Sequence, residues 1–409
     1  MGGRHTFAVG GALARTLDPV RRLNFPRRSV LLGLAAAPFG VAACSSDDKA
    51  PPAPGSSTTS KPATTTTKPK PTVTGTGLPA DLLASLRLLY LGGAVPSTGE
   101  VAPALKKRKP RTATVAVAGS VGAWKGFPIA VVSSGKDLSL LVRTRGTWTL
   151  VGGWWPSLGV ARTPVATKRV LAIGSDARPT QKVNGQRADS LHIIGVDAKG
   201  VGGIVGIPRD SWMALSSGGT NKINAALAFG GPQAVVRSLE RASGVQLDGY
   251  LITGFKGFRA MVNAMGGIRY VAPAVFRGEH GVLAKKGLNI LRGEPALSFA
   301  RERHTLANGD FGRSLNQGKL ILAGMGMARS GGPKALVKYL SAMSKHVETD
   351  LTPAEVLNLA AAVFQTNPNT VKNTVVPGGV GTRSGQSVVL LGSGARKIFG
   401  DLKDGRLGG

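Results

Sequence analysis

The sequence predicts a layered α/β domain preceded by a small β-rich domain. From Lys168 onward, apolar runs of strand length alternate with longer amphipathic stretches, which is the pattern of an α/β fold. Between residues 112 and 155, short β-type runs are separated by turn sequences such as Ser134-Gly-Lys-Asp137. The two patterns predict two domains of different class in one chain.

The first 44 residues predict a lipoprotein-type signal peptide. Arg27-Arg28 precedes an apolar run, residues 30–43, that is too short to span a bilayer as a helix. The run ends at Cys44, the only cysteine of the chain, in a pattern similar to a bacterial lipobox. We therefore expect a protein exported and lipidated at Cys44, anchored to the outer face of the cytoplasmic membrane. A buried, inert cysteine is the alternative interpretation.

The charge balance predicts an anionic partner. Lys and Arg number 52 against 21 Asp and Glu, which gives a formal charge of +31. Nucleic acid, anionic lipid headgroups and a phosphorylated polymer would each suit such a chain. Because the first 44 residues predict export and no recognition-helix motif stands out, we expect no nucleic-acid partner.

Two segments separate the signal peptide from the α/β domain. Residues 45–77 are rich in Pro, Thr, Ser and Lys, which predicts a disordered linker. Residues 78–160 are expected to form the small β-rich accessory domain. Its predicted elements are a helix at 81–91 and strands at 112–118, 129–133, 138–143 and 147–151.

The α/β domain is expected over residues 165–395, followed by a flexible C-terminal tail at 396–409. Apolar runs predict strands at 170–173, 191–196, 204–207, 250–253, 268–271 and 371–376. Amphipathic spacing predicts helices at 232–242, 255–265, 293–303, 312–329, 333–346 and 353–364.

The first three of these strands begin or end at clusters of Asp and Arg. The run 170–173 leads into Gly174-Ser175-Asp176, and the run 204–207 leads into Pro208-Arg209-Asp210. Arg187 and Asp189 precede the middle run. Charged groups at the ends of buried strands are how α/β sheets present a site along one edge. Ion-paired strand ends within ordinary turn sequences are the alternative interpretation.

Six arginines in such contexts predict a phosphate-binding site: Arg178, Arg187, Arg209, Arg301, Arg303 and Arg313. The planar guanidinium donates two parallel hydrogen bonds to phosphate. Asp176 and Asp189 supply hard oxygen ligands for Mg²⁺, which is usually held by one or two carboxylates plus substrate phosphates. No nucleotide P-loop signature occurs, so a diphosphate with its metal ion is the predicted ligand.

Seven motifs in order resemble the LytR-CpsA-Psr (LCP) family over about residues 165–365. They are Gly174-Ser-Asp-Ala-Arg178, Arg187-Ala-Asp-Ser190, Ile207-Pro-Arg-Asp210, Lys222-Ile-Asn-Ala225, Gly266-Gly267, Ala300-Arg-Glu-Arg303 and Asp310-Phe-Gly-Arg313. The resemblance implies an extracytoplasmic, layered α-β-α domain with a central mixed sheet.

The resemblance also implies a Mg²⁺-dependent phosphotransferase that moves a glycopolymer from a polyprenyl-diphosphate carrier onto peptidoglycan. By position, Asp176 and Asp189 would hold the metal ion. The six arginines would line the diphosphate, with Gln317 as a further donor. Asp189 or Asp210, beside Arg209, would orient or deprotonate the acceptor hydroxyl, and the sequence leaves that choice open. An apolar groove for the prenyl tail is expected near the helices at 232–265.

One position departs from the family pattern, because Asn316 precedes Gln317 where the family usually carries an arginine. Loss of that guanidinium leaves open a non-catalytic lipoprotein that binds cell-wall polymer or polyprenyl diphosphate. Hydrolysis of the diphosphate lipid by water is a side activity that the same residues would support. A LytR-type transcriptional regulator is a third class, and the predicted export signal argues against it.

Overall fold

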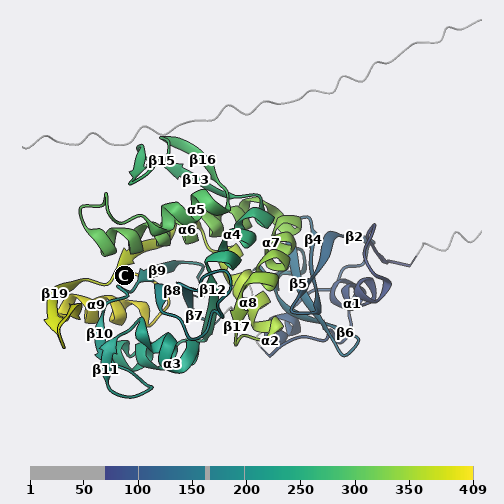
Figure 1. The fold of residues 1–409 in the computed structure, drawn as a ribbon. Coiled ribbons are helices and arrows are strands. Elements are labelled where there is room, and N and C mark those ends of the chain that lie inside the picture. The colour runs from purple at the N-terminus through teal and green to yellow at the C-terminus, as the bar shows by residue number, and fades with distance from the viewer. Residues whose placement is uncertain (1–69, 100, 162–165, 198, 409) are drawn as a thin grey trace, which may run out of the picture. The chain divides into compact units, whose positions relative to one another are not determined.

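The computed structural model describes residues 70–99, 101–161, 166–197 and 199–408 (Figure 1). The expected signal peptide with Cys44, and residues 45–69 of the expected linker, lie outside the described residues. Within the described ranges, no helix combines the length and the apolar character needed to cross a membrane.

A six-stranded mixed sheet forms the centre of the α/β part, in the order β17-β12-β7-β8-β9-β18. β12 runs parallel to β7 and β18 runs parallel to β9, whereas the other neighbours are antiparallel. This arrangement confirms the expected central mixed sheet. The strands are β7 (Lys168–Ser175), β8 (Ala188–Val196), β9 (Gly202–Gly206), β12 (Gly249–Gly254), β17 (Glu348–Thr349) and β18 (Lys372–Val375).

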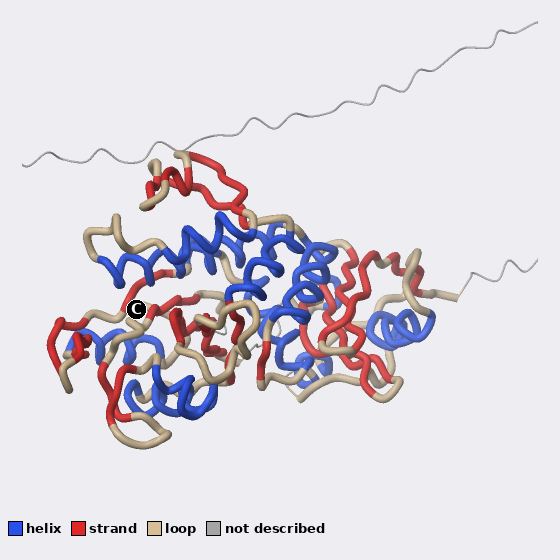
Figure 2. The backbone as a smooth tube through the Cα atoms, in the orientation of Figure 1, coloured by secondary structure: helices blue, strands red, loops and turns tan. Residues whose placement is uncertain are grey.

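Helices cover both faces of this sheet, as Figure 2 shows, which confirms the layered α-β-α architecture. On one face, Leu171 and Ile173 of β7 pack with α3 (Ala225–Ser243) and α9 (Ser393–Leu402). Val170 points to the opposite face and joins α7 and α8. The helices of that second face are α4 (Phe255–Met265), α5 (Gly293–Arg301), α6 (Gly309–Ser330), α7 (Gly332–His346) and α8 (Pro353–Gln365).

Short antiparallel pairs extend from these layers, and of them the sequence patterns predict only β13. Four of these strands, β10, β11, β14 and β15, have only three or four residues, too few for a strand pattern to be recognised. The pairs are β10 (Trp212–Ala214) with β11 (Thr220–Lys222), β13 (Ile268–Ala272) with β16 (Gly287–Leu291), β14 (Phe276–Gly278) with β15 (Gly281–Ala284), and β19 (Gly378–Arg383) with β20 (Gln386–Leu391).

The β-rich part is a four-stranded antiparallel sheet that shares a core with the α/β part. It comprises β3 (Ala118–Trp124), β4 (Phe127–Ser134), β5 (Asp137–Thr144) and β6 (Thr147–Trp154). One face packs on α1 (Ala80–Leu91), which is accompanied by α2 (Ala102–Lys106). The other face carries Ile129 and Val131 into a single hydrophobic cluster with α7 and α8. The hydrophobic core therefore continues across the domain boundary that was expected near residue 160.

Two glycines allow this close approach of sheet and helices. A Cβ at Gly122 would lie 2.5 Å from Ser341 Oγ and 2.6 Å from a methyl group of Val337 in α7. A Cβ at Gly152 would lie 2.9 Å from the Cβ of Ala361 in α8. Larger side chains at these positions would force the sheet off the helices, because protein interiors have few voids to absorb them.

The linker and the C-terminal tail are both shorter than the sequence predicts. Val73 and Thr74 form strand β1, which pairs in parallel with β2 (Val115–Ala116), so the fold begins before residue 78. Residues 396–402 continue helix α9, and Phe399, Leu402 and Leu407 are buried in the main core. Ala395, Phe399 and Leu402 recur at a helical spacing of four and three residues. Because charged residues lie between them, this helix was not predicted from the sequence.

Replacing Leu402 with alanine is expected to lower the free energy of unfolding by about 2–5 kcal/mol, because Leu402 is fully buried. Chemical denaturation monitored by circular dichroism measures this change. Arg396→Ala, on the exposed side of the same helix, is the control and should change stability by less than about 0.5 kcal/mol. Equal stability of the two variants would show that the chain end does not pack on the core.

Candidate active site

The ends of four strands meet at one edge of the central sheet. β7 ends at Ser175 and β12 ends at Gly254, in parallel. β8 runs antiparallel to β7 and to β9, so its first residues lie beside the last residues of both neighbours. The three predicted clusters, which contain Asp176, Asp189 and Arg209, are consequently brought to the same edge.

A β-bulge places Asp189 at this edge. Gly174 pairs with Ser190 and Ser175 pairs with Ala188, which leaves Asp189 as the extra residue between the two pairs. A bulge interrupts the regular alternation of side chains, and such irregularities are frequent next to active sites because they re-aim one side chain. Asp189 consequently lies in the wall of a large apolar cavity.

Asp189 starts a chain of four alternating charges. Its Oδ1 lies 2.5 Å from Nη1 of Arg209, and Nε of Arg209 lies 3.7 Å from Oδ2 of Asp310. The other oxygen of Asp310 lies 2.9 Å from Nη2 of Arg313. Asp310 lies in the first turn of α6, and its partner Arg209 lies about a hundred residues earlier, in the loop after β9. It belongs to one of the motifs, but its bridging position was not predicted.

Arg209 and Arg313 each keep one N–H donor that has no acceptor in the described residues. Nε of Arg209 and Nε of Arg313 are buried and have no hydrogen-bond acceptor among the described residues. Burial lowers the pKa of Arg313, and the nearby charges of Arg209 and Arg303 act in the same direction, against Asp310. Burial also opposes the charge of Arg209, but Asp189, Asp310 and Asp210 raise its pKa overall. Buried cations with unpaired donors are suited to an anionic ligand.

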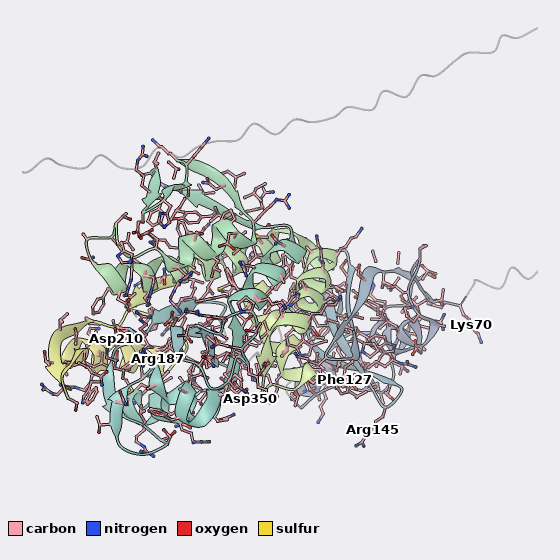
Figure 3. All side chains as sticks on the ribbon, viewed as in Figure 1. Lys70, Phe127, Arg145, Arg187, Asp210 and Asp350 are labelled. Atoms are coloured by element: carbon pink, nitrogen blue, oxygen red, sulfur yellow. The ribbon has the colours of Figure 1, made fainter. Side chains whose placement is uncertain are left out.

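The remaining four predicted arginines are not engaged by carboxylates. Arg178, Arg187, Arg301 and Arg303 form no ion pair with any residue in the described ranges. The guanidinium of Arg301 lies over the ring of Phe255, 4.8 Å from its centroid, which fixes it at the start of α4. Figure 3 shows Arg187 and Asp210 in the same part of the ribbon, far from Lys70. These side chains are free to contact a ligand.

Asp176 and Asp210 have different environments. Oδ1 of Asp176 accepts a hydrogen bond from the backbone N–H of Arg187 at 2.8 Å, and the backbone N–H of Asp176 donates to the carbonyl of Arg187. Oδ1 of Asp210 lies 3.2 Å from Nζ of Lys222, and Asp210 is not part of the cavity wall. Asp189 and Asp210, which the sequence left as alternatives for one role, therefore differ in two respects: Asp189 lines the cavity and pairs with Arg209, whereas Asp210 pairs with Lys222 and does not line it.

Asp176 and Asp189 each keep a carboxylate oxygen of the hard kind that Mg²⁺ prefers. Each carboxylate has one oxygen engaged by protein and a second oxygen without a partner in the described residues. Those residues contain no group of three or more His, Cys, Asp or Glu side chains that could enclose a metal ion. Two carboxylates completed by water and phosphate oxygens are a usual Mg²⁺ environment in proteins, whereas a closed protein cage is not.

An apolar cavity of about 370 Å³ extends from this charged edge into the helical layer. Its walls come from β7 and β12 and from the helices α4, α6, α7 and α8, with side chains such as Met261, Leu320 and Leu340. The charged residues of its lining are Asp189, Arg301 and Arg313. Of the helices at 232–265, where a groove was expected, α4 lines the cavity, whereas α3 packs on the other face of the sheet.

Gln317 and Asn316 are both engaged by protein groups. Gln317 lines the cavity, and its Nε2 donates one of its two N–H groups to the carbonyl of Ala300 at 3.0 Å, so the second N–H has no acceptor among the described residues. The side chain of Asn316 is buried, and its Oδ1 accepts a hydrogen bond from Nζ of Lys319 at 2.9 Å. The ammonium group of Lys319, from the next turn of α6, therefore lies beside position 316, where the family pattern has arginine.

His192 is buried below the site and is expected to make the fold acid-sensitive. Burial lowers its pKa to about 4, against 6.5 in an unfolded chain, while Nε2 donates to the carbonyl of Ser314. The unfolded chain therefore binds a proton first as the pH falls. Stability should be fully present above pH ~6.5 and decline by about 3 kcal/mol as the pH falls to ~4.

Thermal midpoints of the wild type and of His192→Gln between pH 7 and pH 4 measure this contribution. The glutamine amide can still donate to Ser314 but does not titrate. The variant should therefore lose less stability than the wild type over this interval. Parallel pH profiles would show that His192 does not contribute to the acid sensitivity.

The sequence profile of the LytR_cpsA_psr family matches residues 162–399, more than half of the chain. The chain belongs to this family. Among its relatives, TagU of Bacillus cereus, described as a polyisoprenyl-teichoic acid–peptidoglycan teichoic acid transferase, is 32% identical over 196 residues. The match covers 46% of this chain and 62% of TagU, so it spans less than two thirds of that relative.

Two solved structures have a similar fold. The crystal structure of TagV of Bacillus subtilis is 27% identical, with a TM-score of 0.50 over 59% of this chain and 98% of that one. Protein gbs0355 of Streptococcus agalactiae gives a TM-score of 0.51 at 22% identity, covering 59% of this chain and 90% of that one. These likenesses agree with the mixed sheet and the helical layers of this chain.

Proposed function

We propose that this LCP protein is a Mg²⁺-dependent phosphotransferase that moves a glycopolymer from a polyprenyl-diphosphate carrier onto peptidoglycan. The observation that carries the proposal is the apolar cavity whose charged wall residues are Asp189, Arg301 and Arg313. A molecule that suits both surfaces has a long hydrocarbon tail joined directly to an anionic head. The names of TagU and TagV, which are polyisoprenyl-teichoic acid–peptidoglycan transferases, support the same substrate class.

In this proposal the cavity holds the prenyl tail and the arginines hold the diphosphate. Burial of the tail in the cavity contributes about 0.8 kcal/mol for each methylene removed from water. Arg301 and Arg313 line the cavity, and Arg178, Arg187, Arg209 and Arg303 would complete the contacts to the diphosphate outside it. Each charge-assisted hydrogen bond to phosphate contributes about 1.5–3 kcal/mol. The diphosphate would thereby be fixed at the edge where the strands end.

The proposed reaction is attack by a peptidoglycan hydroxyl on the sugar-side phosphorus. A new oxygen–phosphorus bond forms, the bond to the bridging oxygen breaks, and polyprenyl phosphate leaves. The arginines stabilise the charge that develops on the leaving phosphate. A Mg²⁺ ion bound by Asp176 and Asp189 would supply further neutralisation of the phosphate oxygens. Both carboxylates are ion-paired, and Asp189 is the better candidate to orient the hydroxyl or accept its proton, because it lines the cavity and Asp210 does not.

The proposed site of action follows from the sequence of the N-terminus. Export directed by residues 1–44 and lipidation at Cys44 would hold the domain at the outer face of the cytoplasmic membrane. Polyprenyl-linked substrates and peptidoglycan are both accessible there. Mass spectrometry of the chain isolated from membranes tests the anchor, since diacylglycerol on Cys44 adds a defined mass that Cys44→Ser abolishes.

The decisive experiment measures polyprenyl phosphate released from a polyprenyl-diphosphate oligosaccharide, with and without Mg²⁺ and a peptidoglycan acceptor. The full chain is the protein to assay, because β1 shows that folding begins before residue 78. Release that requires both metal ion and acceptor would support a transferase. Release without acceptor would indicate hydrolysis. Tight lipid binding without release would instead favour a binding protein.

A further inference from the structure

The outer face of the β13–β16 hairpin is apolar where an exposed strand surface is normally polar. In the register of this pair, Val271 lies opposite Leu288 and Arg269 lies opposite Ile290. The alternate residues face inward and are buried against α4, α5 and α6. Val271, Leu288 and Ile290 are 68%, 56% and 57% exposed. Antiparallel strands with one solvated face usually place polar side chains on it.

Exposed apolar side chains are concentrated in this segment. Of the ten large hydrophobic residues that are exposed in the described ranges, five lie between residues 271 and 290, including Val275 and Val282. Single exposed apolar residues are ordinary, but a contiguous cluster marks an interaction surface. Figure 1 shows β13, β15 and β16 standing out from the helical layer above α5.

The same segment is strongly cationic. Arg269, Arg277, Lys285, Lys286 and Arg292 are exposed, against the single acidic residue Glu279. None of these five cations pairs with a carboxylate in the part of the chain that the structure describes. Unpaired cations interleaved with apolar side chains match the interface of an anionic bilayer, where headgroups and the upper acyl chains meet both kinds of group. A water-soluble polyanion would offer no partner for the apolar cluster.

We propose that the hairpin segment 268–292 is a membrane-docking surface that inserts its apolar side chains among anionic lipid headgroups. The inner face of the same hairpin carries Ile268 into the wall of the apolar cavity. Docking would thus bring a bilayer to the structural unit that encloses the cavity. The inference rests on the chemistry of this face and does not require that polymer transfer takes place.

A single fluorescent label on the hairpin tests the proposal. The full chain with Cys44→Ser has no other cysteine, so Leu288→Cys can be labelled alone with a polarity-sensitive dye. Vesicles of phosphatidylglycerol and phosphatidylcholine in roughly equal amounts should shift the emission to the blue, and phosphatidylcholine alone should do so much less. The same dye at Phe229→Cys, exposed on α3 at the opposite face of the sheet, should not respond.

Charge-neutral variants then separate docking from general adsorption. Each cation near an anionic surface contributes roughly fivefold to binding, so Lys285→Gln with Lys286→Gln should raise the lipid concentration at half-maximal shift about 25-fold. Lys106→Gln with Lys107→Gln removes an adjacent pair of exposed lysines at the end of α2, which lies away from the hairpin in Figure 1, and should change the half-maximal lipid concentration less than about twofold. Absence of a shift at residue 288 would overturn the proposal. So would equal shifts at residues 288 and 229, or a vesicle-independent shift that grows with protein concentration, which would indicate a second copy of the chain.

Discussion

Replacing Asp189 with asparagine is expected to reduce kcat/KM for polymer transfer at least about a thousandfold, the largest loss of any single substitution in the site. The carboxylate is the partner of Arg209 at 2.5 Å, lies on the cavity wall, and has a free oxygen suited to Mg²⁺. Asparagine keeps the shape but removes the charge. Arg209 would then keep no close carboxylate partner, because Asp310 is 3.7 Å away and Asp210 acts on it only through its charge.

Asp210→Asn is the matched control for this prediction. It removes the same charge from a residue 21 positions away that is paired with Lys222 and lies outside the cavity wall. Its kcat/KM should fall by less than about tenfold. The assay is steady-state release of polyprenyl phosphate with an acceptor, together with thermal midpoints that verify folding of both variants. A larger loss of kcat/KM in Asp210→Asn than in Asp189→Asn would show that Asp210 is the residue that acts on the acceptor hydroxyl.

The sequence predicted the elements whose signals are local. Helix α4 was expected at residues 255–265 and is observed there, because an amphipathic stretch ends at the pair Gly266-Gly267. The strands that became β7, β8 and β9 were visible as short continuous apolar runs. Their charged ends were equally visible, so the residues of the candidate site could be proposed from the sequence.

The sequence could not predict arrangements that depend on distant partners. Asp310 bridges Arg209 and Arg313, and the first of these is about a hundred residues away in the chain. The bulge at Asp189 is a property of the pairing between β7 and β8. The shared core of the β-rich sheet with α7 and α8 likewise depends on two glycines whose role appears only when Ser341 and Ala361 are placed against them.

Filling the cavity from Gly324 should block the prenyl tail without disturbing the charged site. Gly324 lies on the cavity wall in α6, and a Cβ added there would meet no heavy atom within 4 Å. Glycine is less favourable in a helix than alanine by about 1 kcal/mol and phenylalanine recovers part of that difference, so Gly324→Phe should fold. The ring would occupy the space of several methylenes, each contributing about 0.8 kcal/mol to tail binding.

The expected result is at least about a hundredfold loss of kcat/KM for a carrier with a long prenyl chain, and a much smaller loss for a carrier with a short one. Gly324→Ala, which adds a single carbon at the same position, should leave both substrates nearly unaffected. The comparison of the long and the short prenyl carrier shows whether the tail lies in the cavity, because damage to Asp189 or the arginines would slow both carriers equally. If Gly324→Phe folds and slows the two carriers by the same factor, the tail does not lie in this cavity.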